Sequence, residues 1–132
     1  MSLWPALVYG ALIAPICEEL IFRGILLYIL IKRLGATPAI IISAAAFGIY
    51  HWFSFDVLGN PVQMIITFII TGAMGIILAF GYAKTFSLYI PIAIHLGWNL
   101  TQIFIFSQGP IGNGLLVPSV PDQFRTNSYF IF

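Results

Sequence analysis

The segment from Val62 to Tyr82 carries no charged residue, and this run constrains the fold more than any other feature of the chain. Its length matches the ~20 residues that an α-helix needs to cross the hydrocarbon core of a bilayer. Gly72 and Gly75 lie within the run, and small residues of this kind let neighbouring membrane helices approach closely. The segment therefore predicts a transmembrane helix that packs against others.

The composition extends this prediction to the whole chain. Only 7% of the 132 residues are charged and 61% are hydrophobic, whereas a soluble domain carries about 25% charged residues. The chain is long enough for about four crossings of the membrane. We therefore predict an integral, multi-pass, all-α bundle of about four transmembrane helices surrounded by membrane lipid. The few basic residues are scattered, which argues against nucleic acid as a partner.

Proline, glycine and charged residues divide the chain into apolar segments. We expect helices over Leu3–Ile31, with a bend at Pro15, and then over Ala39–Phe53, Val62–Tyr82 and Leu88–Phe106. The second is short for a crossing, and Pro91 in the fourth should free a carbonyl one turn earlier. Residues 1–106 would form the membrane-embedded catalytic core. Glycines and prolines then predict an irregular C-terminal tail over residues 107–132.

Three charged residues lie inside the first segment, although a charge near the bilayer centre costs at least ~3 kcal/mol on insertion scales. Glu19 and Arg23 are spaced i, i+4 with the acid first, which favours an ion pair on one helix face. Glu18 is rotated by ~100° and cannot share that pair equally. We expect Glu19 and Arg23 to neutralise each other and support a site, and Glu18 to find its partner on another helix.

Polar groups also lie in the second and fourth segments, at His51, His95 and Asn99. His95 and Asn99 are spaced i, i+4 and share one helix face. Counting ~1.5 Å per residue from the segment ends places these side chains and Glu18 at a similar depth of about 17–22 Å. Because neighbouring segments cross the bilayer in alternate directions, we expect all four groups to converge on one buried site.

A carboxylate and two imidazoles in one site suit hydrolysis. Glu18 and His51 would hold and activate a water, while His95 and Asn99 would donate hydrogen bonds to the oxyanion that forms when a carbonyl is attacked. The same Glu18, His51 and His95 form a two-histidine, one-glutamate set that can bind zinc with an open water position. The residues leave open whether a divalent metal such as zinc takes part or none does.

Non-catalytic interpretations fit the same residues. A single buried histidine or asparagine more often bonds a neighbouring helix than performs chemistry. The chain would then be a non-enzymatic membrane protein, such as an immunity or scaffolding factor, or a transporter of protons or metal ions. Four polar groups at one depth beside an ion pair favour the enzyme.

Three short motifs occur in order, each on a separate expected helix: Glu18-Glu19-x-x-x-Arg23, Phe47-x-x-x-His51 and His95-x-x-x-Asn99. With these motifs the chain resembles the CPBP intramembrane protease family. That family includes the type II CAAX prenyl endopeptidases and relatives linked to bacteriocin processing and immunity. The resemblance covers about residues 14–100, and the order of the three motifs makes it specific.

The resemblance implies an intramembrane endopeptidase, of metallo- or glutamic type, that acts on a peptide or a lipidated protein in a prokaryotic cell membrane. It implies that Glu18 and His51 activate the water and that His95 and Asn99 stabilise the oxyanion. Glu19 and Arg23 would hold the site in shape. Members of the family have more than four helices, so we expect this chain to correspond to their catalytic core.

Two criteria predict opposite membrane orientations. Lys32, Arg33 and Lys84 place the loops at 32–37 and 82–87 in the cytoplasm, with Arg125 on the other side. The prenyl-protease branch of the family is expected to open its site to the cytosol near the N-terminal half of the glutamate-bearing helix, which places these loops outside. We follow the resemblance, because a difference of three basic residues to one is small.

Overall fold

The computed structural model describes residues 8–103, and within them every regular element is helical. Four helical rods follow one another along the chain, which confirms the predicted all-α bundle. The expected first residue of the core helices, Leu3, and their expected last residue, Phe106, lie outside the described residues. The irregular tail predicted for residues 107–132 lies outside them as well.

The first rod is one continuous helix that changes its hydrogen-bonding pattern along its length. It consists of η1 (Tyr9–Ile13), α2 (Ala14–Glu19), η2 (Leu20–Leu27) and α3 (Tyr28–Leu34), where η1 and η2 are π-helical. Pro15 is the second residue of α2, so the proline lies at the change from π- to α-helical pairing. Lys32 and Arg33 lie inside the last turn, so the rod ends after Leu34 and not at Ile31 as predicted.

The second rod, α4 (Ala36–Ser54), begins earlier than predicted. The expected break between Ile31 and Ala39 is reduced to Gly35, whose φ of 83° is readily adopted only by a residue without a Cβ. Pro38 lies in the first turn of α4, where its missing N–H costs no helical hydrogen bond. With 19 residues, α4 is long and apolar enough to cross a membrane, so the expectation that it is short for a crossing was wrong.

The third rod, α5 (Pro61–Thr85), contains the uncharged segment, and an 18-residue stretch of it has a mean hydropathy of 2.3. Asn60 caps it by accepting a hydrogen bond from the Gln63 N–H, and Pro61 takes the first helical position. Among residues 8–103, α4 and α5 are the two helices that have the length and hydropathy of membrane spans.

The fourth rod, α6 (Tyr89–Thr101), carries the last motif. Pro91 falls within its first turn, where backbone N–H groups have no helical partner in any case. Pro91 therefore interrupts no hydrogen bond in the interior of α6, and the carbonyl that it leaves without a helical donor lies before the helix.

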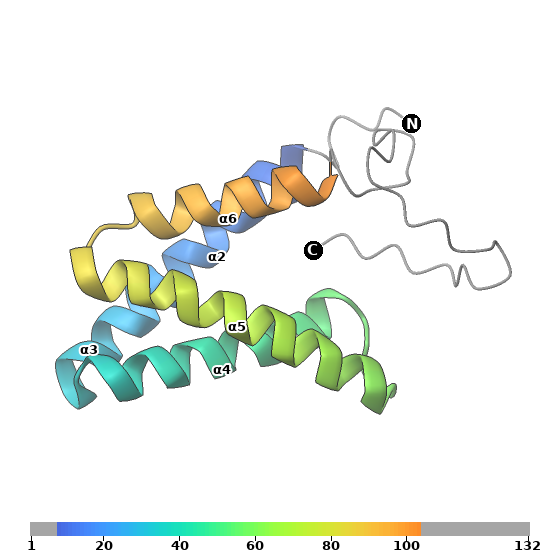
Figure 1. Ribbon diagram of the computed structural model, residues 1–132, viewed down its shortest axis with the longest axis horizontal. Helices are drawn as coiled ribbons and strands as arrows, with labels where there is room; N and C mark the ends of the chain where they lie inside the picture. Colours follow the sequence, from blue (N-terminus) through green and yellow to red (C-terminus); the bar gives the residue numbers. More distant parts are fainter. Residues whose placement is uncertain (1–7, 104–132) are drawn as a thin grey trace, which may run out of the picture.

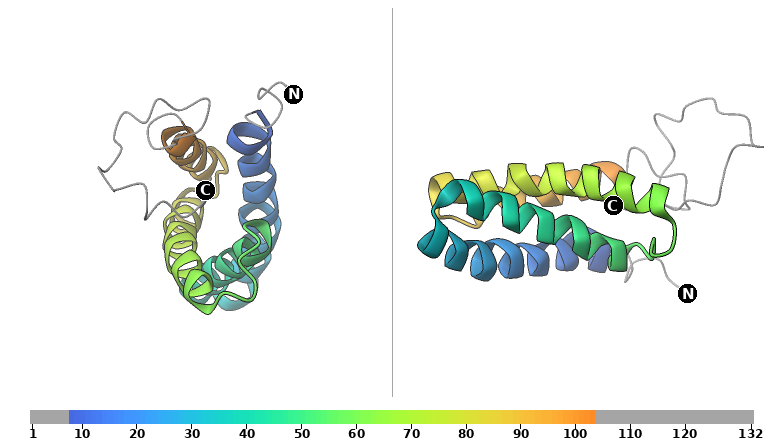
Figure 2. Two further views of the ribbon diagram at one scale, coloured as in Figure 1. Left: turned by 90° about the vertical axis from the view of Figure 1, so that its right-hand side faces the viewer. Right: turned by 90° about the horizontal axis from the view of Figure 1, so that it is seen from below.

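The rods alternate in direction and are arranged so that α6 returns to the first rod (Figure 1). Viewed along the rods, the first rod, α4, α5 and α6 follow one another around the bundle (Figure 2). Contacts link α4 to η2, α3 and α5, and link α6 to α5, α2 and η1. The motif-bearing helices α2, α4 and α6 therefore face a common interior.

Candidate active site

Glu19 and Arg23 form the ion pair that their spacing predicts. Arg23 Nη1 lies 3.1 Å from Glu19 Oε1, and both side chains are fully buried. Arg23 Nη2 also donates to the carbonyl of Gly75 on α5 at 3.3 Å. The guanidinium carbon lies 4.2 Å from the centre of the Phe47 ring on α4, a cation–π contact that gains strength when desolvated. Arg23 thus connects three rods at the base of the site.

Glu19 has a second partner, which the sequence did not predict. His95 Nδ1 lies 2.8 Å from the same Oε1 that accepts from Arg23. Since a carboxylate paired with a guanidinium accepts hydrogen bonds, we assign the Nδ1 proton to His95. Glu19 thus pairs with Arg23 as expected, and it also bonds the His95 ring and so sets its orientation.

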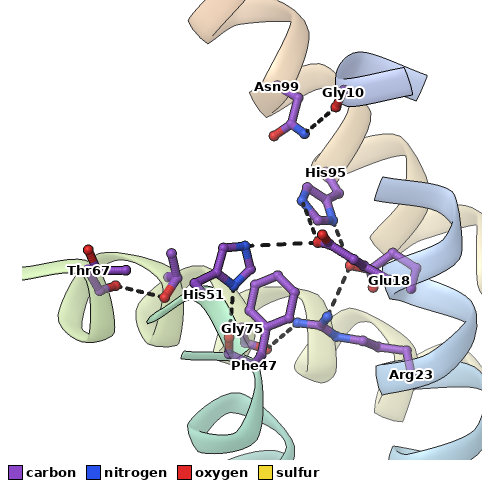
Figure 3. A network of polar contacts seen from close by, with 11 residues as sticks. Gly10, Glu18, Arg23, Phe47, His51, Thr67, Gly75, His95 and Asn99 are labelled. Carbon is purple, nitrogen blue, oxygen red and sulfur yellow. Dashed lines mark hydrogen bonds and ion pairs between the residues drawn. The ribbon is translucent and has the colours of Figure 1, made fainter. Parts of the chain in front are cut away.

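Glu18 lies between the two histidines (Figure 3). Its Oε2 is 3.7 Å from His95 Nε2 and 4.0 Å from His51 Nε2. The other nitrogen of His51, Nδ1, lies 2.8 Å from the Phe47 carbonyl oxygen, one turn back along α4. A carbonyl can only accept, so Nδ1 carries a proton and Nε2 faces Glu18. The structure therefore brings Glu18, His51 and His95 together from three rods.

Asn99 lies one turn beyond His95 on α6 and contacts a different partner. Its Nδ2 donates to the carbonyl oxygen of Gly10 in η1 at 3.2 Å. Its Oδ1 is buried and has no hydrogen-bond partner within residues 8–103. Asn99 thus shares the site's interior, but it makes no hydrogen bond with Glu18, His51 or His95 among the contacts found there.

A small cavity adjoins these groups. The cavity has a volume of ≈ 20 Å³, enough for one or two waters. Its polar lining comes from His51, His95, Asn99 and Thr71, and aromatic rings, including those of Phe47 and Trp98, complete the wall. The site therefore combines water-sized space with acceptors and donors in an otherwise apolar interior.

Several contacts at the site could not be read from the motifs. The Tyr50 side chain interacts electrostatically with Glu18 from the position next to His51. Its place in a helix that carries a motif was the one available signal. Thr71 lines the cavity and donates to the Thr67 carbonyl within α5. The backbone carbonyls of Gly10 and Gly75 accept hydrogen bonds from Asn99 and Arg23. Residue types in the sequence do not predict which backbone carbonyls will do so.

Glu18 lies somewhat farther from the two histidines than zinc ligands lie from one another. Zinc ligands of the N and O type bind at ~2.0–2.2 Å in a tetrahedron, which places donor atoms about 3.4 Å from one another. Glu18 Oε2 is 3.7 and 4.0 Å from the two histidine nitrogens. Within residues 8–103, no three His, Cys, Asp or Glu side chains are arranged to hold a metal ion. The zinc set of Glu18, His51 and His95 stays a hypothesis.

Comparisons with known proteins agree with the motifs. The family model described as type II CAAX prenyl endopeptidase Rce1-like matches residues 1–101. The chain is also 30% identical over 125 residues to the "Putative membrane peptidase YdiL" of Bacillus subtilis (strain 168). That alignment covers 95% of this chain but 46% of the relative, so the chain spans about half the length of the curated relative it matches. No solved structure matches the chain.

The family match spans all three motifs and the rods that bring them together. It also agrees with the two apolar helices of membrane-spanning length. The chain is a membrane protein that belongs to the Rce1-like family of type II CAAX prenyl endopeptidases.

Proposed function

We propose that this chain is the catalytic core of a multi-pass intramembrane endopeptidase in a prokaryotic cell membrane. It hydrolyses a peptide bond of a CAAX-type peptide or lipidated protein with a water activated by Glu18 and His51. Family membership supports the reaction class, and the name of the curated relative agrees with it. The geometry of the polar groups supports the roles assigned below.

The observation that carries the proposal is the orientation of the His51 ring. Because Nδ1 donates to the Phe47 carbonyl, a neutral ring presents a bare Nε2 toward Glu18. One water that donates two hydrogen bonds of ~2.8 Å reaches acceptors about 4.4 Å apart. Glu18 Oε2 and His51 Nε2 are 4.0 Å apart. A water bound to both directs its lone pairs away from them, toward a substrate carbonyl.

The proposed reaction consumes one water for each peptide bond. The water oxygen attacks the carbonyl carbon as a proton passes to Glu18. His95, whose ring Glu19 holds at Nδ1, donates from Nε2 in its protonated form to the oxyanion. The tetrahedral intermediate then expels the amine while Glu18 returns the proton to the leaving nitrogen, which restores the carboxylate.

The test is cleavage of a prenylated CAAX peptide, and of the same peptide without the lipid, by the purified protein in detergent. Glu18→Gln, His51→Ala and His95→Ala should each lower kcat/KM by ~10²–10⁴ while the thermal unfolding midpoint stays within a few degrees. Asp56→Asn, in the loop after α4, is the matched acid-to-amide control and should keep full activity.

Substantial activity in any of the three site variants would contradict the proposal. Each reaction is repeated with a metal chelator. Loss of cleavage in its presence would show that the attacking water is bound to a metal and is not activated by the protein side chains alone. A wild-type protein that binds but never cleaves either peptide would favour a non-enzymatic role.

A further inference from the structure

Three exposed basic residues lie at one end of the bundle. Lys32 and Arg33 belong to the last turn of α3, and Lys84 belongs to the last turn of α5. The turn at Gly35 and the connection from α5 to α6 follow these residues and lie at the same end (Figure 1). We call Lys32, Arg33 and Lys84 the basic rim.

One apolar cluster joins the helix ends that carry the basic rim. Its members come from all four rods and include Leu27, Ala39, Ala79 and Tyr82, with Ile31 and Leu88 packed against them. Lys32 follows Ile31 directly, and Lys84 is two residues beyond Tyr82. The backbone positions of the three charges are therefore set by a single packed cluster.

The positive charge of the basic rim is not neutralised within residues 8–103. None of its side chains forms an ion pair with a described acid. Glu18 and Glu19 lie with the histidines inside the bundle, and Asp56 lies in the loop between α4 and α5, at the opposite end. Three like charges at one end favour a partner that brings negative charge.

The two lysines direct their ammonium groups back toward the bilayer. Lys32 Nζ lies 5.6 Å from the centre of the Tyr28 ring, and Lys84 Nζ lies 5.3 Å from the centre of the Phe80 ring. Both rings are exposed on the outer surface of the bundle, one helical turn closer to its middle. At ~1.5 Å per residue the 25 residues of α5 exceed the ~30 Å of the hydrocarbon core, so its ends reach the headgroups. The ammonium groups therefore lie at the depth of lipid headgroups.

We propose that the basic rim binds the headgroups of anionic phospholipids through their phosphate groups. The Arg33 guanidinium can bind a phosphate with two hydrogen bonds, and the lysines add point charges. Each basic residue near an anionic membrane surface contributes about a fivefold preference for it. A phospholipid fits better than a soluble phosphate compound, because the lysines lie over rings that face lipid. This inference does not rest on the proposed function.

Lipid binding gives the basic rim a role on either side of the membrane. The basic residues alone predict a cytoplasmic position, whereas the family resemblance places this end outside. A headgroup phosphate is present in both leaflets, so the proposed contact forms in either orientation. It holds this end of the bundle at headgroup level, and with it the depth of the buried site.

The test compares the lipids next to the two ends of the bundle. In a Cys17→Ala background, a bimane fluorophore is attached to Leu34→Cys, beside the basic rim, or to Leu58→Cys, at the opposite end. The two leucines are matched, since both are 50% exposed. The purified protein is placed in phosphatidylcholine vesicles that contain a small fraction of quencher lipid. The quencher is phosphatidylglycerol or phosphatidylcholine with the same nitroxide-labelled acyl chain, present in both leaflets.

At Leu34→Cys, phosphatidylglycerol should quench at a concentration at least about fivefold lower than phosphatidylcholine. At Leu58→Cys the two lipids should quench equally. Combining Lys32→Gln, Arg33→Gln and Lys84→Gln should abolish the preference, whereas Lys32→Arg with Lys84→Arg should keep it because the charges remain. Raising the salt concentration to about 1 M should weaken it by screening.

Equal quenching by the two lipids at Leu34→Cys would overturn the inference, as would the same preference at Leu58→Cys. A preference that persists in the triple glutamine variant would show that the basic rim does not cause it. Loss of the preference in millimolar inorganic phosphate, at constant ionic strength, would show a site for soluble phosphate compounds and overturn the assignment to lipid. The comparison of the two labelled positions does not depend on any charge variant folding.

Discussion

At the scale of single residues, Arg23 shows how a cation is kept in an apolar helix. It is fully buried and meets a carboxylate, a backbone carbonyl and an aromatic face. The carboxylate partner, Glu19, was predictable because i, i+4 neighbours share a face in any helix. The Gly75 carbonyl and the Phe47 ring come from other rods, so their contacts depended on packing.

Removing one member of this buried pair should destabilise the protein strongly. Arg23→Met and Glu19→Gln should each cost about 3–5 kcal/mol, because each leaves an uncompensated buried group. The double variant should cost less than the sum of the two. Thermal or denaturant unfolding in detergent measures the cycle, and Lys32→Met, at an exposed position, is the control.

Additive costs in that cycle would show that Arg23 and Glu19 are not coupled. The outcome is informative because Glu19 has a second partner. His95 donates to the same oxygen, so Glu19→Gln should also lower activity more than Arg23→Met does, once both proteins are measured below their unfolding temperatures.

At the scale of the helices, the close packing of α4 against α5 depends on glycine. A Cβ built at Gly75 would lie 3.0 Å from Ala44 Cα and 3.3 Å from both the Ala44 Cβ and the Phe47 ring. The sequence identified Gly75 as a position for close helix approach. It could not identify α4 as the neighbour, nor that the Gly75 carbonyl would bind Arg23.

Gly75→Ala should therefore destabilise the protein by about 1–3 kcal/mol, the usual cost of overpacking. Peptidase activity should fall with it, because separating α5 from α4 weakens the Arg23 contact. Gly97→Ala in α6 is the matched control: a Cβ there meets nothing within 4 Å, so stability should be unchanged or slightly raised. Unfolding midpoints and kcat/KM for both variants check the prediction. Equal effects at the two glycines would contradict it.

The first rod contains features that its sequence does not signal. The π-helical segments η1 and η2 lie on either side of the two glutamates, and π-helical turns are frequent at functional sites. Within η2, the Phe22 carbonyl accepts from the buried Ser43 hydroxyl of α4 at 3.3 Å. Because a π-helical turn shifts the angular position of later residues, an ideal-helix count could not give the neighbours of Glu18.

At the scale of the molecule, the two ends of the bundle differ in their content of basic residues. The turn at Gly35 and the connection from α5 to α6 lie at one end, and the loop between α4 and α5 lies at the other (Figure 1). The basic residues Lys32, Arg33 and Lys84 belong to the first end. Cysteine labelling can test this arrangement because Cys17, the chain's single cysteine, can be removed.

In a Cys17→Ala background, Lys32→Cys and Lys84→Cys should react with a membrane-impermeant maleimide from one face of the membrane. Leu58→Cys, exposed in the opposite loop, should react only from the other face. Following the family resemblance, we expect the Leu58 face to be cytosolic. Labelling of Leu58→Cys from outside the cell would instead support the orientation predicted by the basic residues. Labelling of all three positions from one face would contradict the bundle itself.

The sequence by itself determined that the chain lies in a membrane, how many helices it forms and that Glu19 pairs with Arg23. Each of these depends on local composition or on spacing within one helix. The tertiary structure alone decided that His95 binds Glu19, 76 positions away, and that Asn99 binds Gly10, 89 positions away. In hydrocarbon the helices are apolar on nearly every face, so the hydrophobic pattern does not define how each is rotated. Only packing sets that rotation, and with it the direction in which each polar side chain of the site points.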